Sequence, residues 1–191
     1  MQIFVSGSLA YDRIMDFPGR FVDHILPEKI HILNVCFMVN GLTERFGGTA
    51  GNIAYNLALL GEKPVILATA GKDFGPYREW LTSLGLPLTG IKEISEEFTA
   101  GAYITTDRSD NQITGFNPGA MKYRSEYRFD GVDPAAALAI GPGEPGGHAG
   151  LYPGLPEPGR ALHLRPRPEH PGLGGRRTQG DGRRGPGPHR Q

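Results

Sequence analysis

The chemistry that this sequence offers lies in groups that bind hydroxyls: Asp12, Asn52 and the glycine pair Gly47 and Gly48. A carboxylate can accept two hydroxyl protons, and an amide both donates and accepts hydrogen bonds. The glycines would let backbone N–H groups approach a ligand with no Cβ in the way. Together these groups suit ribose or a hexose. A plain turn from a loop into a helix would use the same glycine pair, so on this motif alone both interpretations stay open.

The surrounding elements must bring these groups together. A short apolar run at residues 3–6 predicts a buried first strand, and Ser8 and Asp12 follow it. The glycine pair opens a predicted helix that Gly61 ends, and its first turn would supply unpaired N–H donors and the positive end of the helix dipole. Because ligands of open α/β sheets bind outside the carboxyl ends of the strands, we expect Ser8, Asp12 and this helix start to meet there.

Strands and helices alternate along the first 133 residues. The apolar run at 64–70 predicts a strand covered on both faces, residues 77–84 a short helix, and residues 88–94 a weaker strand. This order predicts an α/β fold with a mostly parallel sheet and helices on both faces.

Two β-rich insertions interrupt that alternation. Residues 17–40 predict an excursion with at least one strand, placed at 32–39, where β-forming residues gather. Residues 98–107 and 111–116 flank a polar turn and predict a hairpin. The insertions could pair as a small second sheet, a lid across the strand ends.

Other kinds of site are disfavoured. A Walker A loop needs a glycine five residues before its Gly-Lys pair, but Gly71 and Lys72 have Ile66 there. Asp73 then stands where Ser or Thr belongs, and it could instead cap the following helix. The single Cys36 allows no internal disulfide and no cysteine-based metal site, and no metal site is predicted.

Several linked motifs resemble those of one enzyme family. Residues 47–71 are similar to the N-terminal signature of the PfkB carbohydrate kinases, a branch of the ribokinase-like proteins. The signature positions are filled by Gly47, Gly48, Asn52, Ala54, Gly61 and Gly71. The motifs GSLAYD, GKDFG and NPGAM further resemble a bacterial adenosine-kinase-like branch. The resemblance covers residues 1 to about 133.

The resemblance implies a ribokinase-like fold with a β-sheet lid formed by about 13–45 and 97–118. It implies transfer of the ATP γ-phosphoryl group, with Mg²⁺, to a hydroxyl of adenosine, another nucleoside or a sugar. The implied substrate-binding residues are Ser8, Asp12, Gly47, Gly48, Asn52 and Phe116. Phe116, on the lid hairpin, could stack on a nucleobase or simply pack within the lid. A homodimer formed through the open edges of the lid is a further expectation.

One family motif has no counterpart in this sequence. PfkB kinases carry a later GAGD motif, whose Asp is the general base and whose N–H groups form the anion hole. Gly180, Asp181 and Gly182 are only a superficial echo of it. With no catalytic residue to assign, we expect a truncated, inactive form of a kinase, with only the N-terminal half of the fold and most of the ATP site missing.

The composition changes near Pro134. Residues 134–191 hold 14 Gly and 11 Pro, with 8 basic against 4 acidic residues. A segment of this composition buries too little apolar surface on folding to offset the loss of chain entropy. One interpretation is a disordered Gly/Pro/Arg-rich tail. The other is a shifted reading frame of a GC-rich gene, which produces the same mixture of residues.

The remaining expectations concern location and partners. The N-terminus lacks a basic region followed by an apolar run, which predicts no signal peptide, no membrane association and a cytoplasmic protein. The formal net charge of zero makes a nucleic-acid partner unexpected. Two alternatives to the kinase stay open, namely a non-catalytic protein that binds a sugar or nucleoside, and a protein that binds nucleic acid through the Arg-rich tail.

Overall fold

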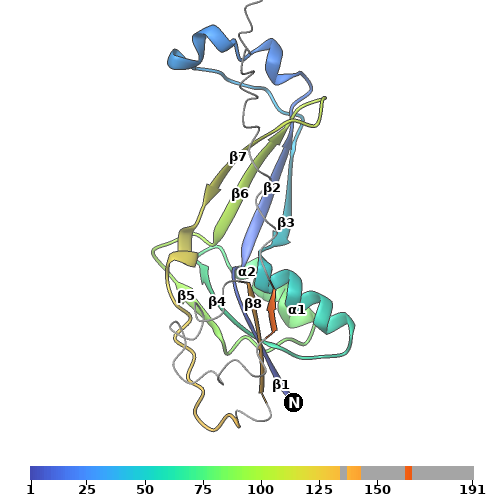
Figure 1. The fold of residues 1–191 in the computed structure, drawn as a ribbon, viewed down its shortest axis with the longest axis vertical. Coiled ribbons are helices and arrows are strands. Elements are labelled where there is room, and N and C mark those ends of the chain that lie inside the picture. The colour runs from blue at the N-terminus through green and yellow to red at the C-terminus, as the bar shows by residue number, and fades with distance from the viewer. Residues whose placement is uncertain (134–136, 143–161, 165–191) are drawn as a thin grey trace, which may run out of the picture.

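The larger of two sheets is parallel throughout. The computed structural model describes residues 1–133, 137–142 and 162–164, and Figure 1 shows their arrangement. The strands are β1 (Gln2–Ser6), β4 (Val65–Gly71), β5 (Ile91–Ile94), β8 (Ala137–Pro142) and β9 (Leu162–Leu164). Their order is β5-β4-β1-β8-β9, and each neighbouring pair is parallel. The predicted parallel α/β sheet is therefore confirmed.

The second sheet is mixed and forms the predicted lid. Its strands, in spatial order, are β3 (Leu42–Gly47), β2 (Ala10–Asp16), β6 (Ala100–Thr106) and β7 (Gln112–Asn117). The central pair β2 and β6 is parallel, and the two outer pairs are antiparallel. β6 and β7 form the hairpin that the sequence predicts. Figure 1 shows this sheet extending away from the larger one, as a lid would.

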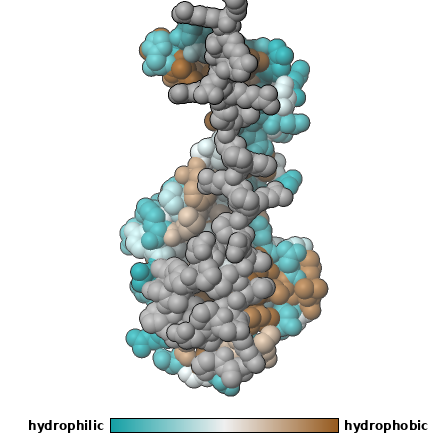
Figure 2. Space-filling model, viewed as in Figure 1, coloured by the Kyte–Doolittle hydropathy of each residue, from teal (hydrophilic) through white to brown (hydrophobic). Residues whose placement is uncertain are grey.

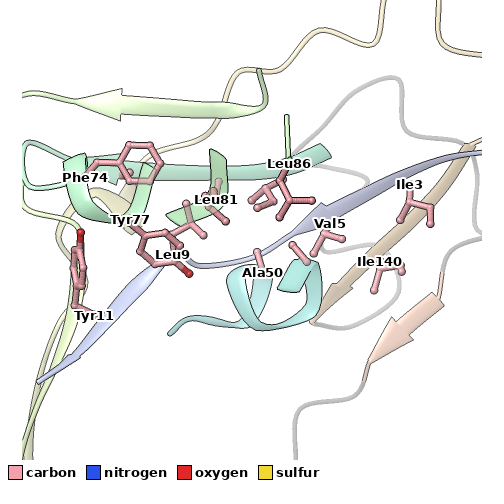
Figure 3. Close-up of a cluster of buried hydrophobic side chains, with 14 residues drawn as sticks. Ile3, Val5, Leu9, Tyr11, Ala50, Phe74, Tyr77, Leu81, Leu86 and Ile140 are labelled. Carbon is pink, nitrogen blue, oxygen red and sulfur yellow. The ribbon is translucent and has the colours of Figure 1, made fainter. Parts of the chain in front are cut away.

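The two α-helices of the described residues, α1 (Thr49–Leu59) and α2 (Gly75–Ser83), pack on one face of the larger sheet. Ile3 and Val5 of β1 lie in one apolar cluster with residues of both helices (Figure 3). The intervening Phe4 points to the other face, where Tyr127 and Phe129 cover it. Helices on both faces, as the sequence predicts, are thus not found within 1–133 and 137–142, because an irregular segment covers the second face.

The predicted strand at 32–39 is wrong. The excursion instead contains two short 3-10 helices, η1 (Phe21–Asp23) and η2 (Pro27–Ile32), followed by irregular chain. The ring of Phe37 lies 4.6 Å from that of Phe17 and 5.3 Å from that of Phe21, centroid to centroid. Residues 32–39 are of β-forming types, but they lie beyond the ends of the lid strands and have no neighbouring strand to pair with. Phe37 instead packs in an aromatic cluster with Phe17 and Phe21.

Hydrophobic side chains remain exposed in two places on the face shown in Figure 2, the end of the lid and the C-terminal end of α1. Ile30 and Ile32 represent the first place, and Leu59 and Leu60 the second. The described part of the chain therefore has exposed apolar side chains in addition to the two buried clusters.

Strand β8 lies beyond the domain boundary predicted at 133. It pairs with β1 through residues such as Ile3 with Leu138, and Ile140 is buried in the main cluster. The sheet therefore continues past the change in composition. Apart from strand β9 (Leu162–Leu164), the rest of the predicted tail lies outside the described residues. It includes residues 180–182 and most of the stretch that the shifted reading frame would explain. No helix in the described residues is long and apolar enough to cross a membrane.

Candidate functional site

The start of helix α1 is held by Ser8, which follows strand β1. The Ser8 hydroxyl accepts a hydrogen bond from the Thr49 N–H at 3.1 Å, and the Ser8 carbonyl accepts from Ala50 at 3.0 Å and from Gly51 at 3.4 Å. These are three of the N–H groups that a helix start leaves unpaired. The expectation that they are free for a ligand is therefore wrong, because Ser8 already binds them.

The Gly48 position requires glycine for a structural reason. Its φ is +88°, a conformation that residues with a side chain rarely adopt. An added Cβ would lie 2.5 Å from the Ser8 carbonyl oxygen and 2.8 Å from the Ala10 nitrogen. Gly48 therefore lets helix α1 begin close against the turn that joins β1 to β2.

Gly47 serves a different purpose, since the carboxylate of Asp12 occupies the space that a Cβ would need. Its carbonyl accepts a hydrogen bond from the buried Tyr77 hydroxyl at 2.9 Å. Burial, and then the nearby Tyr11 and Asp12, raise the pKa of Tyr77 well above its usual value, so its hydroxyl stays protonated as a donor. The backbone at Gly47 is thus fixed from one side, while the Asp12 carboxylate lies against the other.

Asp12 and Phe116 lie on the same face of the lid sheet. In the strand register, Asp12 pairs with Arg45 on one side and with Ala102 on the other, and Ala102 pairs with Phe116. Side chains of paired residues stand on the same face, and strands are about 4.8 Å apart, so Asp12 and Phe116 stand about 10 Å apart across the small Ala102. Phe116 is 55% exposed. Both residues could be predicted as site residues from the sequence, but the strand register that relates them could not.

Asn52 lies on the first turn of α1 and is exposed. Its backbone N–H donates to the Gly48 carbonyl at 3.0 Å, and its own carbonyl accepts from the Asn56 side chain at 2.7 Å. Among the described residues its side-chain amide makes no hydrogen bond to the other predicted site residues. The structure therefore places Asn52 next to the glycine pair, at an exposed position on α1.

Asp73, in the turn between β4 and α2, contacts lid residues in a way that the sequence does not reveal. Asp73 does not cap helix α2, which has no side-chain cap; one of its carboxylate oxygens accepts from the Thr99 N–H at 2.7 Å. Its other oxygen accepts from Arg13 at 3.5 Å. These partners lie 26 and 60 positions away in the sequence. Spacing along the chain therefore cannot predict such pairs.

Within the described residues, no group of three or more His, Cys, Asp or Glu side chains is placed to hold a metal ion. The predicted site residues Asp12, Asn52 and Phe116 offer hydrogen-bonding groups and an aromatic ring to a polar ligand.

The comparison with protein families agrees with this geometry. The sequence matches the pfkB family carbohydrate kinases over residues 18–142. The chain belongs to this family.

Several of the proteins similar to this chain are nucleoside kinases. Over 116 residues the chain is 30% identical to a nucleoside kinase of Methanothermobacter thermautotrophicus. The matched region covers 59% of this chain and 38% of the relative. The structure of Burkholderia thailandensis nucleoside kinase in complex with inosine is 42% identical, with a TM-score of 0.57, and covers 72% of this chain and 43% of that one. A second structure of that enzyme, in complex with ADP-inosine, is 42% identical and has a TM-score of 0.52. The match covers 74% of this chain and 44% of the Burkholderia chain. The chain thus spans less than half the length of these relatives.

Proposed function

We propose that this protein is a nucleoside kinase and that the described residues hold its nucleoside. The observation that carries the proposal is the register that places Asp12 and Phe116 on one face of the lid sheet with Ala102 between them. A carboxylate can accept the hydroxyl protons of ribose, and an exposed aromatic ring can stack on a base. A nucleoside joins such a sugar to such a base.

The spacing favours a nucleoside over a free sugar. A separation of about 10 Å across two strand intervals is suited to a ligand with a sugar at one end and a planar ring at the other. A free pentose would reach the carboxylate of Asp12 without needing the ring of Phe116. The identity of 42% to an enzyme whose structure contains inosine supports the same substrate class.

In the whole kinase, the co-substrate would be ATP with Mg²⁺, as the resemblance implies and as the ADP-inosine complex of the Burkholderia enzyme supports. ATP would supply the γ-phosphoryl group that is transferred to a ribose hydroxyl. The residues of this chain would bind and orient the nucleoside, with Asp12 accepting hydroxyl protons in hydrogen bonds. Because the printed sequence contains no GAGD motif, we expect the chain to bind nucleoside without phosphorylating it.

Calorimetric titration of the full 191-residue chain with inosine, adenosine and ribose tests the proposal. We expect the nucleosides to bind more tightly than ribose. Asp12→Asn should weaken inosine binding by about 2 kcal/mol, because hydrogen bonds to a charged group are lost. Asp16→Asn is the matched control, since Asp16 lies on the same strand at its exposed far end.

Three results would contradict parts of the proposal. Equal affinities for ribose and inosine would show that the base is not recognised. Unchanged inosine affinity in Asp12→Asn would remove the assigned role of that carboxylate. Formation of ADP and a nucleoside monophosphate by this chain, measured in a coupled assay, would overturn the expectation that it is inactive.

A further inference from the structure

The two residues that flank Asp12 on strand β2 are both tied to Asp73. The Tyr11 hydroxyl donates to the Asp73 carbonyl oxygen at 2.9 Å, and the Arg13 guanidinium donates to the Asp73 carboxylate at 3.5 Å. Side chains alternate between the two faces of a strand, so Asp12 points to the face opposite its neighbours. Asp73 thus holds the side chains on both sides of Asp12, and it does so from the face of β2 opposite to the Asp12 carboxylate.

The same Asp73 also holds the other central strand of the lid. Its second carboxylate oxygen accepts from the N–H of Thr99, directly before β6, at 2.7 Å. Asp73 itself belongs to the turn between β4 and α2, which is part of the larger sheet and its helices. One side chain of the larger sheet's turn is therefore joined to both β2 and β6, where these strands enter the lid.

The ion pair between Arg13 and Asp73 is largely shielded from water. Their side chains are 15% and 20% exposed, respectively. Arg13 also donates to the Glu44 carboxylate at 2.8 Å and to the Tyr103 hydroxyl at 3.2 Å, which reach it from β3 and β6. Arg13 is thus fixed within the lid by two partners and fixed to the body by Asp73. Removing the negative charge of Asp73 would leave this shielded guanidinium with one carboxylate instead of two.

We infer that Asp73 is a positioning residue for nucleoside binding, which sets the orientation of β2 and thereby of the Asp12 carboxylate without contacting the ligand. The identity of the ligand rests on the proposed function, whereas the control of β2 by Asp73 rests on the contacts above. Residues that act through a neighbour commonly change affinity by several-fold, so loss of the Asp73 charge should weaken inosine binding about tenfold.

The test compares the full chain with Asp73→Asn. This variant keeps an oxygen that can accept from Thr99 and loses the charge that faces Arg13. Hydrogen exchange of the ligand-free proteins is measured first, and the amides of residues 10–14 should exchange about fivefold faster in the variant, while those of residues 65–70 stay unchanged. Calorimetry with inosine should then show the tenfold loss. The control is Glu93→Gln, which breaks the exposed pair of Arg78 and Glu93 outside the lid.

Each result decides between the inferences. Exchange at residues 10–14 and inosine affinity both equal to those of the unmodified chain would overturn the positioning role. Faster exchange throughout both sheets would also overturn it, since the role would then be general stability. If the unmodified chain does not bind inosine, the proposed function fails, and the exchange pattern still decides whether Asp73 orients β2. If Asp73→Asn does not fold, Tyr11→Phe, which removes only the hydrogen bond to the Asp73 carbonyl, is measured by the same criteria.

Discussion

The Ser8 hydroxyl accepts a hydrogen bond from the Thr49 backbone N–H at 3.1 Å, although the two residues are 41 positions apart. Gly48 occupies the N-cap position of α1 and has no side chain with which to cap the helix. Ser8 supplies the cap from the end of the first strand. The glycine pair is therefore held at the carboxyl end of the sheet by a contact that also stabilises the helix.

Ser8→Ala should lower the free energy of unfolding by about 1 kcal/mol, because the Thr49 N–H loses its acceptor. Urea denaturation followed by circular dichroism measures this change. Ser95→Ala is the control, since Ser95 is exposed and its hydroxyl donates to the adjacent Glu96 side chain. Equal destabilisation by the two substitutions would mean that Ser8 does not act as a cap.

Gly47→Ala should displace the Asp12 carboxylate, because the added methyl group needs the space that this carboxylate fills. We expect a loss of stability of about 1–3 kcal/mol, as for other overpacked sites, together with weaker inosine binding. Gly75→Ala is the matched control, since no heavy atom lies within 4 Å of a Cβ added there. Inosine affinity of Gly47→Ala equal to that of the control would show that the position of Asp12 does not matter for binding.

Phe116→Ala should weaken the binding of inosine by about 1–3 kcal/mol, the usual value of stacking between a base and an aromatic ring. The affinity for ribose should not change, and the stability should change little because Phe116 is 55% exposed. Ile113→Ala serves as the control, since Ile113 lies on the same strand with its side chain on the opposite face and is 45% exposed. If inosine binds Phe116→Ala as tightly as it binds the control, the ring packs within the lid and does not contact the base.

Asp107 should make the end of the lid sensitive to acid. Burial raises the pKa of this carboxyl, but hydrogen bonds from the backbone N–H of Phe21, from Asn111 and from Ser109 outweigh it and lower the pKa to about 2. In the unfolded chain an Asp has a pKa of about 3.9. The stabilisation is therefore fully present above about pH 3.9 and is lost as the pH falls towards 2.

Thermal unfolding between pH 2 and 5 measures this loss, with Asp107→Asn as the comparison. The pKa of Asp23 is also lowered, because the Arg20 side chain donates a hydrogen bond to its carboxylate. The difference between the unmodified chain and Asp107→Asn isolates the Asp107 contribution. Identical pH profiles of the two proteins would contradict the prediction.

The parts of the fold that local sequence determines could be predicted. The continuous apolar run that became β4 and the helix between Gly48 and Gly61 both agree with the structure to within a residue or two. The hairpin of β6 and β7 agrees as well. In each case the pattern of apolar residues and the flanking turn residues specify the element without help from distant contacts.

The parts that depend on distant partners could not be predicted. Residues 32–39 have strand-forming types, yet Phe37 packs with Phe17 and Phe21 in place of forming a strand. The pair of Arg13 and Asp73 joins residues 60 positions apart. Strand β8 lies in a segment rich in Gly and Pro, and what makes it a strand is its place beside β1. Propensity is a weak guide wherever tertiary pairing decides.

Strand β1 is synthesised well before its neighbour β8 and is enclosed only when β8 arrives, because Gln2 of β1 pairs with Ala137 of β8. At ribosomal rates of about 5–20 residues per second, one edge of β1 stays open for on the order of ten seconds. An apolar strand with an open edge is a template for pairing with other chains. Newly made protein that stops short of β8 should therefore depend on chaperones for its solubility, whereas protein that includes β8 should not.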